Sequence, residues 1–187
     1  MIRKFAALAL AVLLSACGRN EAWHATDITG AMPKLAFAMS RASDGAAVTA
    51  RDYHGRVVLL YFGYTHCPDI CPATLANLTD VLRRLGSRAK DVSVLFVTVD
   101  PNRDTLPILK AYTNAFAPEI DGLRGSPDAL AALARRYRVA FSVTKNPYTV
   151  MHSSAVFFFD RNGRARLVTM NTDDIAGLTS DLNRLLD

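Results

Sequence analysis

The sequence lacks low-complexity tracts, heptad patterns and internal repeats, which excludes a fibrous or solenoid protein. It has no block of basic residues and no basic patch interleaved with aromatics, so it does not indicate a nucleic-acid partner. Its N-terminal apolar run, residues 5–14, is far shorter than the roughly 20 residues of a membrane helix. With 187 residues, 50% of them hydrophobic and 21% charged, the chain suits one soluble domain with a sizeable core.

The N-terminus is typical of an exported lipoprotein. Two cations, Arg3 and Lys4, precede the short apolar run, as in a secretory signal peptide. The run ends in Leu-Ser-Ala-Cys at residues 14–17, which is similar to a bacterial lipobox. In that motif the cysteine, here Cys17, is diacylated and becomes the new N-terminus. An ordinary signal peptide cleaved near Ala16 is the alternative.

We therefore expect three regions along the chain. Residues 1–16 form a lipoprotein signal peptide, and residues 17–33, which are polar and small, form the lipid anchor and a tether. Residues 34–187 form the folded domain. Loss of Arg3 and Lys4 with the signal peptide lowers the formal net charge from +5 to +3, which is a mild excess.

Cysteine is scarce, and this isolates one pair. The chain has three cysteines, and acylation of Cys17 leaves Cys67 and Cys71 as thiols. An exported domain also lies where disulfides persist. Any thiol chemistry of the folded domain is therefore expected at these two residues.

Hydrophobic periodicity predicts alternating strands and helices. Strands are expected over residues 35–39, 57–62, 92–99, 155–159 and 165–170, and helices over residues 71–85, 104–116, 130–137 and 173–186. The order is βαβα(α)ββα, a parallel βαβ unit followed by an antiparallel hairpin and a helix. This order predicts a single α/β domain of thioredoxin-like fold, with a generic doubly wound α/β domain as the alternative.

Cys67 and Cys71 stand four residues apart at the predicted turn from strand to helix. The partial positive charge of a helix N-terminus lowers the pKa of a thiol there. Helical positions i and i+4 place their Cβ atoms about 5–6 Å apart, whereas a disulfide needs about 4 Å. The spacing favours a shared soft metal ion. Pro68 and Pro72 allow a bent loop, in which the two cysteines could still form a redox disulfide. A purely structural disulfide is the third hypothesis.

A stable site for Cu(I) or Zn needs a third ligand beside the two thiolates. His24 in the tether and His54 in a surface turn are expected to be incidental, and His66 adjoins Cys67 but points in another direction. His152 lies in a loop entering a buried strand, which a thioredoxin-like domain places beside the dithiol turn. His152 is thus a candidate ligand, and a histidine that serves only as a hydrogen-bond partner is the alternative.

Three segments together resemble the Sco/SenC family of copper-binding proteins from respiratory-oxidase assembly. They are VVLLYFGYTHCPDICPATL (57–75), FVTVDPNRDTLPILKAY (96–112) and YTVMHSSAVFFFD (148–160). The likeness runs from about Leu35 to the C-terminus, with matching order and spacing. It implies a thioredoxin-like domain with a copper site.

The resemblance implies that Cys67, Cys71 and His152 bind copper, as Cu(I), Cu(II) or both. It implies delivery of that copper to the CuA centre of cytochrome c oxidase subunit II, with a periplasmic copper donor and a thioredoxin-like reductant as further partners. A thiol–disulfide reductase with Cys67 and Cys71 as its redox dithiol is the alternative, and copper sensing or buffering is a third. The transfer role changes no covalent bond in a substrate, whereas the reductase role does, so the sequence leaves enzyme status open. The location implied is the periplasmic face of the bacterial envelope, with a lipid anchor in the inner membrane.

Four residues near these motifs carry further expectations. The family usually has an acidic residue before the histidine, whereas this chain has Met151, which we expect to pack. Asp100 and Asp104 match positions in the second segment. We expect the main role of Asp104 to be capping a helix, and its secondary role to be modulation of the metal site. Asp69, exposed beside the thiols, is expected to recognise a partner.

Overall fold

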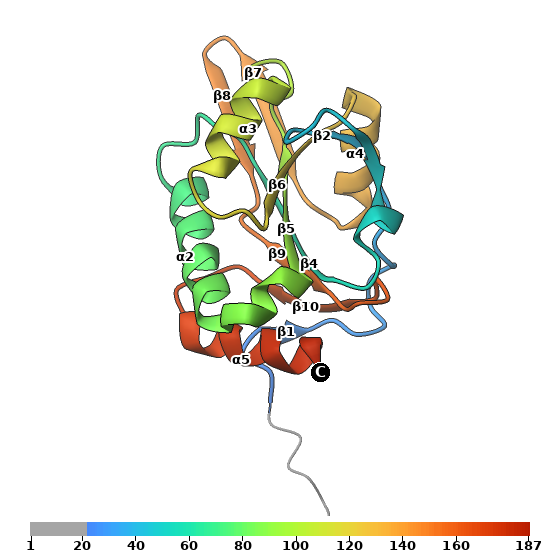
Figure 1. The fold of residues 1–187 in the computed structure, drawn as a ribbon. Coiled ribbons are helices and arrows are strands. Elements are labelled where there is room, and N and C mark those ends of the chain that lie inside the picture. The colour runs from blue at the N-terminus through green and yellow to red at the C-terminus, as the bar shows by residue number, and fades with distance from the viewer. Residues whose placement is uncertain (1–21) are drawn as a thin grey trace, which may run out of the picture.

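An eight-stranded mixed sheet runs through the centre of the computed structural model, which describes residues 22–187 (Figure 1). The predicted signal peptide and Cys17 lie outside the described residues. The strands of this sheet are β1 (Thr26–Asp27), β2 (Ala38–Arg41), β3 (Ala47–Thr49), β4 (Val57–Gly63), β5 (Val92–Thr98), β6 (Ile120–Arg124), β9 (Val156–Phe159) and β10 (Ala165–Thr169). Across the sheet their order is β1-β10-β9-β4-β5-β6-β2-β3.

Helices cover both faces of the sheet. They are α2 (Ile70–Leu85), α3 (Leu106–Asn114), α4 (Pro127–Arg136) and α5 (Ile175–Leu186), with short 3-10 turns η2 (Ala50–Tyr53) and η3 (Gly86–Asp91). Leu75 of α2, Leu109 of α3 and Leu182 of α5 belong to one core cluster. Leu130 of α4 belongs to a second cluster on the opposite face.

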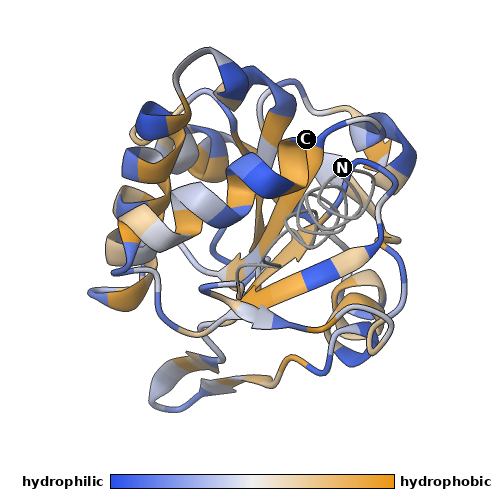
Figure 2. Cartoon of the chain, turned by 90° about the horizontal axis from the view of Figure 1, so that it is seen from below, coloured by the Kyte–Doolittle hydropathy of each residue, from blue (hydrophilic) through white to orange (hydrophobic). Residues whose placement is uncertain are grey.

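The strand β4 explains why both faces need a cover. Its residues alternate between the two clusters, with Leu59 and Tyr61 in one and Leu60 and Phe62 in the other. All seven residues of the strand are buried. A strand that is buried on both faces has a continuous run of apolar residues, whereas a strand with one exposed face alternates apolar and polar residues. Figure 2 shows the central strands coloured hydrophobic, while the helices alternate hydrophobic and hydrophilic positions.

The strand pairing confirms the predicted parallel βαβ unit and the antiparallel hairpin that follows it. β4 and β5 are parallel and joined by α2, and β5 and β6 are parallel as well. β9 is antiparallel to β4, and β10 is antiparallel to β9. The turn at residues 161–163 joins β9 to β10, with Gly163 at φ +68°, a conformation that favours glycine. The C-terminal end of β4, where the chain turns into α2, therefore lies in the middle of the sheet.

The segment predicted to be a tether is packed on the domain from residue 22 onward. Thr26 and Asp27 form β1, which pairs with β10. Just before them, the buried Asp181 carboxylate accepts hydrogen bonds from the backbone amides of His24 and Ala25, at 3.1 and 2.8 Å. Apolar residues of the segment add to these hydrogen bonds, because Trp23 and Ala25 pack in one core cluster and Ile28 packs against the other. Within residues 22–187, no helix is long and apolar enough to cross a membrane.

Several strands carry no apolar run and were not predicted from the sequence. Besides β1, these are β3, β6 and the two strands of a separate hairpin, β7 (Phe141–Lys145) and β8 (Tyr148–His152). In β6, Gly122 interrupts the hydrophobic pattern because α3 approaches closely there. A Cβ on Gly122 would lie 3.2 Å from the Leu109 Cβ. The predicted first strand also begins later, at Ala38, because Leu35 packs into the core from a loop.

Candidate metal centre

The two cysteines lie where β4 ends and α2 begins. Cys67 is half-buried in the connecting loop, and Cys71, the second residue of α2, is fully buried. Both are free thiols, and the Cys71 amide donates a hydrogen bond to the Cys67 Sγ at 3.4 Å. Gly63, the last residue of β4, makes room for this turn. A Cβ at Gly63 would lie 3.0 Å from the Cys71 Sγ and 2.5 Å from the Phe96 ring.

His152 reaches the cysteines from the end of β8. Its Nε2 lies 3.3 Å from the Cys71 Sγ, and its Nδ1 lies 2.9 Å from the Ser153 carbonyl oxygen. A carbonyl oxygen only accepts hydrogen bonds, so Nδ1 carries the proton and donates it. The lone pair of Nε2 therefore points toward the sulfur, which is the orientation that a metal-binding imidazole needs.

The three side chains form a compact set of soft ligand atoms. The Sγ atoms of Cys67 and Cys71 and a ring nitrogen of His152 all lie within 4.8 Å of one another. Metal–sulfur and metal–imidazole bonds are about 2.3 and 2.0 Å long, so atoms that share one ion lie roughly 3.5–4.5 Å apart. The group thus fits a single ion after small side-chain adjustments. Two thiolates and an imidazole suit Cu(I), Cu(II) or Zn.

The two thiols differ in pKa. Burial is the main reason that the pKa of Cys71 rises to about 12. Burial also acts to raise the pKa of Cys67, but hydrogen bonds from the backbone amides of Asp69 and Cys71 outweigh it and leave the Cys67 pKa below its ordinary value. Burial lowers the pKa of His152, which keeps its imidazole neutral near pH 7. Cys67 is therefore the more reactive sulfur.

Aromatic and apolar side chains surround the three ligand atoms. The rings of Tyr61 and Tyr64 meet the His152 ring edge-on, with centroids 6.1 and 5.8 Å away. Outside them, Ile70 and Met151 are 49% and 67% exposed and line a groove with Cys67 and His152. The expectation that Met151 packs is wrong, because its side chain points into solvent at the rim of the site. The site is thus enclosed by side chains on the side of the domain and open to solvent on the opposite side.

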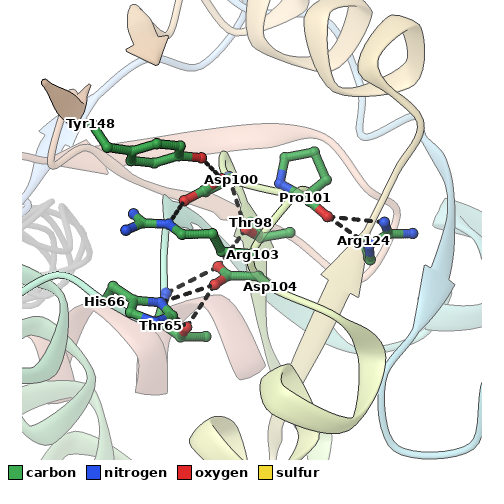
Figure 3. A network of polar contacts seen from close by, with 9 residues as sticks. All are labelled: Thr65, His66, Thr98, Asp100, Pro101, Arg103, Asp104, Arg124 and Tyr148. Atoms are coloured by element: carbon green, nitrogen blue, oxygen red, sulfur yellow. Dashed lines mark hydrogen bonds and ion pairs between the residues drawn. The ribbon is translucent and has the colours of Figure 1, made fainter. Parts of the chain in front are cut away.

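Asp104 does not cap a helix. The helix α3 begins at Leu106 with Thr105 at its N-cap, and no side chain makes a capping bond there. The Asp104 carboxylate is buried and accepts hydrogen bonds from the Thr65 amide and hydroxyl, at 3.0 and 2.6 Å, and from the Thr98 hydroxyl at 2.6 Å (Figure 3). It therefore fixes the loop two residues before Cys67, so it contacts the site only indirectly.

The remaining predicted residues fall outside the three-ligand group. Asp69 is exposed at the N-cap position of α2, and its side chain makes no capping bond. The ring of His66 is exposed and faces Asp104 at 3.7 Å (Figure 3), and it does not join the group formed by Cys67, Cys71 and His152. His54 is exposed, and His24 lies 3.2 Å from Asp174 at the other end of the domain.

Two residues beside the site were not predicted from the sequence. Arg103 and Tyr148 both contact the buried carboxylate of Asp100, which the sequence marks as a motif position without a role (Figure 3). The only sequence signal for Tyr148 is its place four residues before His152 in a strand with mixed polar and apolar residues. That pattern predicts neither its partner nor its direction.

Residues 35–187 match the protein family SCO1/SenC. The mitochondrial SCO2 homolog of Bos taurus is 41% identical over 137 residues, which make up 66% of this chain and 52% of that protein. The chain spans about half the length of the curated relatives that it matches.

Solved structures resemble the whole described domain. ScoI of Bradyrhizobium japonicum with copper bound is similar with a TM-score of 0.74 and 36% identity, over 82% of this chain and 99% of that chain. Apo Sco1 of Thermus thermophilus is similar with a TM-score of 0.80 and 30% identity, over 90% of this chain and 100% of that chain. These likenesses confirm the predicted thioredoxin-like α/β fold.

Proposed function

Because the chain belongs to the SCO1/SenC family, we propose that it is a copper chaperone of respiratory-oxidase assembly. It binds copper through Cys67, Cys71 and His152. It then delivers this copper to the CuA centre of cytochrome c oxidase subunit II. Copper is the cargo of this protein, and the three side chains are its carrier.

The convergence of the three ligand atoms within 4.8 Å is the observation that carries this proposal. Two sulfurs from one turn and a nitrogen from a hairpin some 80 residues later have no structural need to meet. A disulfide would use Cys67 and Cys71 alone, and the imidazole would then face a neutral sulfur. The tautomer of His152, with its free lone pair toward Cys71, also favours a metal ion.

The open side of the site supports transfer by ligand exchange. Three ligands leave copper coordinatively unsaturated, so a thiolate of the acceptor can bind before any ligand of the donor leaves. Cys67 borders the groove, whereas Cys71 is fully buried. The accessible sulfur is therefore displaced first and the buried one last.

Copper titration of single-residue variants tests the site. Cys67→Ala, Cys71→Ala and His152→Ala should each weaken binding by more than the roughly 10–100-fold that loss of a supporting residue costs. His66→Ala is the matched control, since this histidine adjoins Cys67 yet does not join the three-ligand group, and it should bind as the wild type does. Unchanged affinity in His152→Ala would remove the histidine from the site.

Metal transfer tests the function beyond binding. The copper-loaded protein is mixed with an apo CuA domain, and the CuA absorption is followed. Appearance of the CuA spectrum supports delivery. Absence of transfer from a protein that binds copper tightly would instead indicate copper sensing or buffering.

The proposed location follows from the N-terminal sequence. Cys17 is diacylated and becomes the new N-terminus when residues 1–16 are removed, and the anchored domain, residues 34–187 with the packed segment before it, lies at the periplasmic face of the inner membrane. There it meets the oxidase subunit, a periplasmic copper donor and a thioredoxin-like reductant. Labelling with radioactive palmitate and its loss in Cys17→Ser tests the anchor.

The difference in pKa between the Cys67 and Cys71 thiols favours a second candidate function, a thiol–disulfide reductase that acts on the cysteines of the oxidase. The Cys67 thiolate attacks a disulfide of the partner, which forms a mixed disulfide and releases one partner thiolate. The Cys71 sulfur then displaces the second partner thiolate. The partner gains two electrons, and Cys67 and Cys71 end as a disulfide. Activity that survives in His152→Ala, with a reduction potential below that of the partner, would favour this role.

A further inference from the structure

The β7–β8 hairpin that carries His152 stands apart from the main sheet. In the part of the chain that the structure describes, its strands pair with each other alone, and Figure 1 shows the hairpin projecting beyond the sheet. Phe141 pairs with His152 at its base, and Lys145 pairs with Tyr148 at its tip. An isolated two-stranded hairpin is marginally stable in water. The position of His152 therefore depends on contacts between the hairpin and the domain.

The tip of the hairpin is fastened to the loop after β5. The Tyr148 hydroxyl donates a hydrogen bond to the Asp100 Oδ1 at 2.6 Å, and the Arg103 Nε donates one to the Asp100 Oδ2 at 2.5 Å. The Arg103 guanidinium also lies over the Tyr148 ring, 4.0 Å from its centroid. We call Tyr148, Asp100 and Arg103 the hairpin clasp (Figure 3).

The clasp has a rigid foundation. Asp100 is fully buried, and its backbone amide donates a hydrogen bond to the Thr98 hydroxyl at the end of β5. Arg103 also lies 6.0 Å from the ring centroid of Tyr64, which itself meets the His152 ring edge-on. The clasp thus joins the hairpin to the segment that leads into the cysteine turn.

The base of the hairpin has weaker attachments. Phe141 and Val150 are only partly buried where they pack against the core. The hydrogen bond from the Ser153 amide to the Ala140 carbonyl, at 3.0 Å, joins the two flanks of the hairpin to each other and adds no link to another element. The packing of Phe141 and Val150 thus holds the hairpin less firmly than the hydrogen-bonded clasp does. Tyr148 lies four residues from His152 along β8, about 13 Å at strand spacing. Release of the clasp would leave the whole hairpin to these weaker contacts, so the strand that carries His152 would become more mobile and its imidazole would no longer be held in one position.

We infer that the hairpin clasp is a positioning device for His152, which holds Nε2 at the distance from the Cys71 Sγ that a shared ion requires. The inference rests on the proposed copper function. It assigns Tyr148 a role that acts through the histidine, with no contact of its own to the metal. Loss of the clasp should therefore resemble partial loss of the third ligand.

Tyr148→Phe is the variant that tests this role. It removes one hydroxyl and keeps the ring under Arg103, and because Tyr148 is 39% exposed the fold should survive. We expect a roughly tenfold loss of Cu(II) affinity, at the low end of the 10–100-fold that supporting residues contribute. The thiolate-to-Cu(II) absorption should shift, and amide hydrogen exchange across residues 141–152 of the copper-free protein should speed up. Tyr53→Phe is the matched control, because it removes a hydroxyl bonded to Asp121 at 3.1 Å away from the site and should change none of these.

A double-mutant cycle separates positioning from general stability. In the His152→Ala background, Tyr148→Phe should cause no further loss of copper affinity, because the residue through which it acts is gone. An equal loss in both backgrounds, or unchanged affinity and absorption in Tyr148→Phe alone, would overturn the inference. A wild-type protein without copper affinity refutes the proposed function. The exchange data still decide the clasp in that case, and unchanged exchange in Tyr148→Phe would refute it.

Discussion

The two sulfurs of the site differ in both exposure and acidity, and this predicts an order of reaction. Cys67 is half-buried with a pKa below its ordinary value, whereas Cys71 is fully buried with a pKa raised to about 12. Iodoacetamide reacts with the thiolate, so alkylation of Cys67 should begin at a lower pH than for a free cysteine. Cys71 should stay unmodified until well above pH 9. Peptide mass mapping across pH measures this, and Cys71 reacting first would contradict it.

The cysteine turn packs closely against the end of β4 because Gly63 has no side chain. Gly63→Ala would press a methyl group on the Phe96 ring and on the Cys71 Sγ. We expect a loss of about 1–3 kcal/mol in unfolding free energy, as for overpacked cores, together with weaker copper binding. Gly125→Ala is the control, because there a Cβ meets the flexible end of Met39. It should cost less in urea unfolding and leave copper binding unchanged.

At the residue scale, chemistry that belongs to a side chain can be predicted from sequence, but its environment cannot. Cys67, Cys71 and His152 stand out because few residue types bind soft metals. Asp104 has the local signature of a helix cap, and a nearby cap is the usual use of an aspartate before a helix. Its actual donors, Thr65 and Thr98, come from other segments that only the folded chain brings close.

At the scale of elements, long apolar strands were predicted and short or exposed ones were not. The strands β4 and β5 are buried on both faces, so burial itself shapes their sequences. The strands β7 and β8 are mostly exposed, with polar residues among the apolar ones, so no burial pattern marks them in the sequence. Helix α4, predicted over residues 130–137, begins earlier, at Pro127, because the Ser126 side chain caps it by accepting a hydrogen bond from the Ala129 amide.

The loop between β5 and α3 yields a prediction at this scale. Asp104→Asn replaces one carboxylate oxygen, which accepts hydrogen bonds, with an amide NH2 group, which only donates them. The hydroxyl of Thr65 or of Thr98 therefore loses its acceptor. We expect about 1–3 kcal/mol less unfolding free energy and a measurable drop in copper affinity, since the loop before Cys67 loosens. Ser126→Ala removes a true helix cap on α4 and serves as the control. It should cost about 1 kcal/mol and leave copper affinity unchanged.

At the scale of the whole molecule, the N-terminal segment is a fastened part of the domain. Asp181→Ala should leave the amides of His24 and Ala25 without their shared acceptor. The unfolding free energy should fall by about 1–3 kcal/mol, and hydrogen exchange at residues 24–27 should speed up. Copper affinity should not change, because the free-energy effects of substitutions at distant, independent sites are not coupled. A coupled loss of copper affinity would show that the segment and the metal site communicate.

The docking of this segment limits how far the domain could stand from the proposed lipid anchor. The strand β1 lies at one end of the domain and the β7–β8 hairpin at the other (Figure 1). A free linker over residues 17–33 would extend up to about 57 Å, but only about 17 Å of contour separates the proposed anchor Cys17 from residue 22. A domain of this size is roughly 40 Å across. With the proposed anchor at Cys17, the end of the domain that carries β1 would lie close to the bilayer, and the proposed copper site would face an acceptor held at about the height of the opposite end.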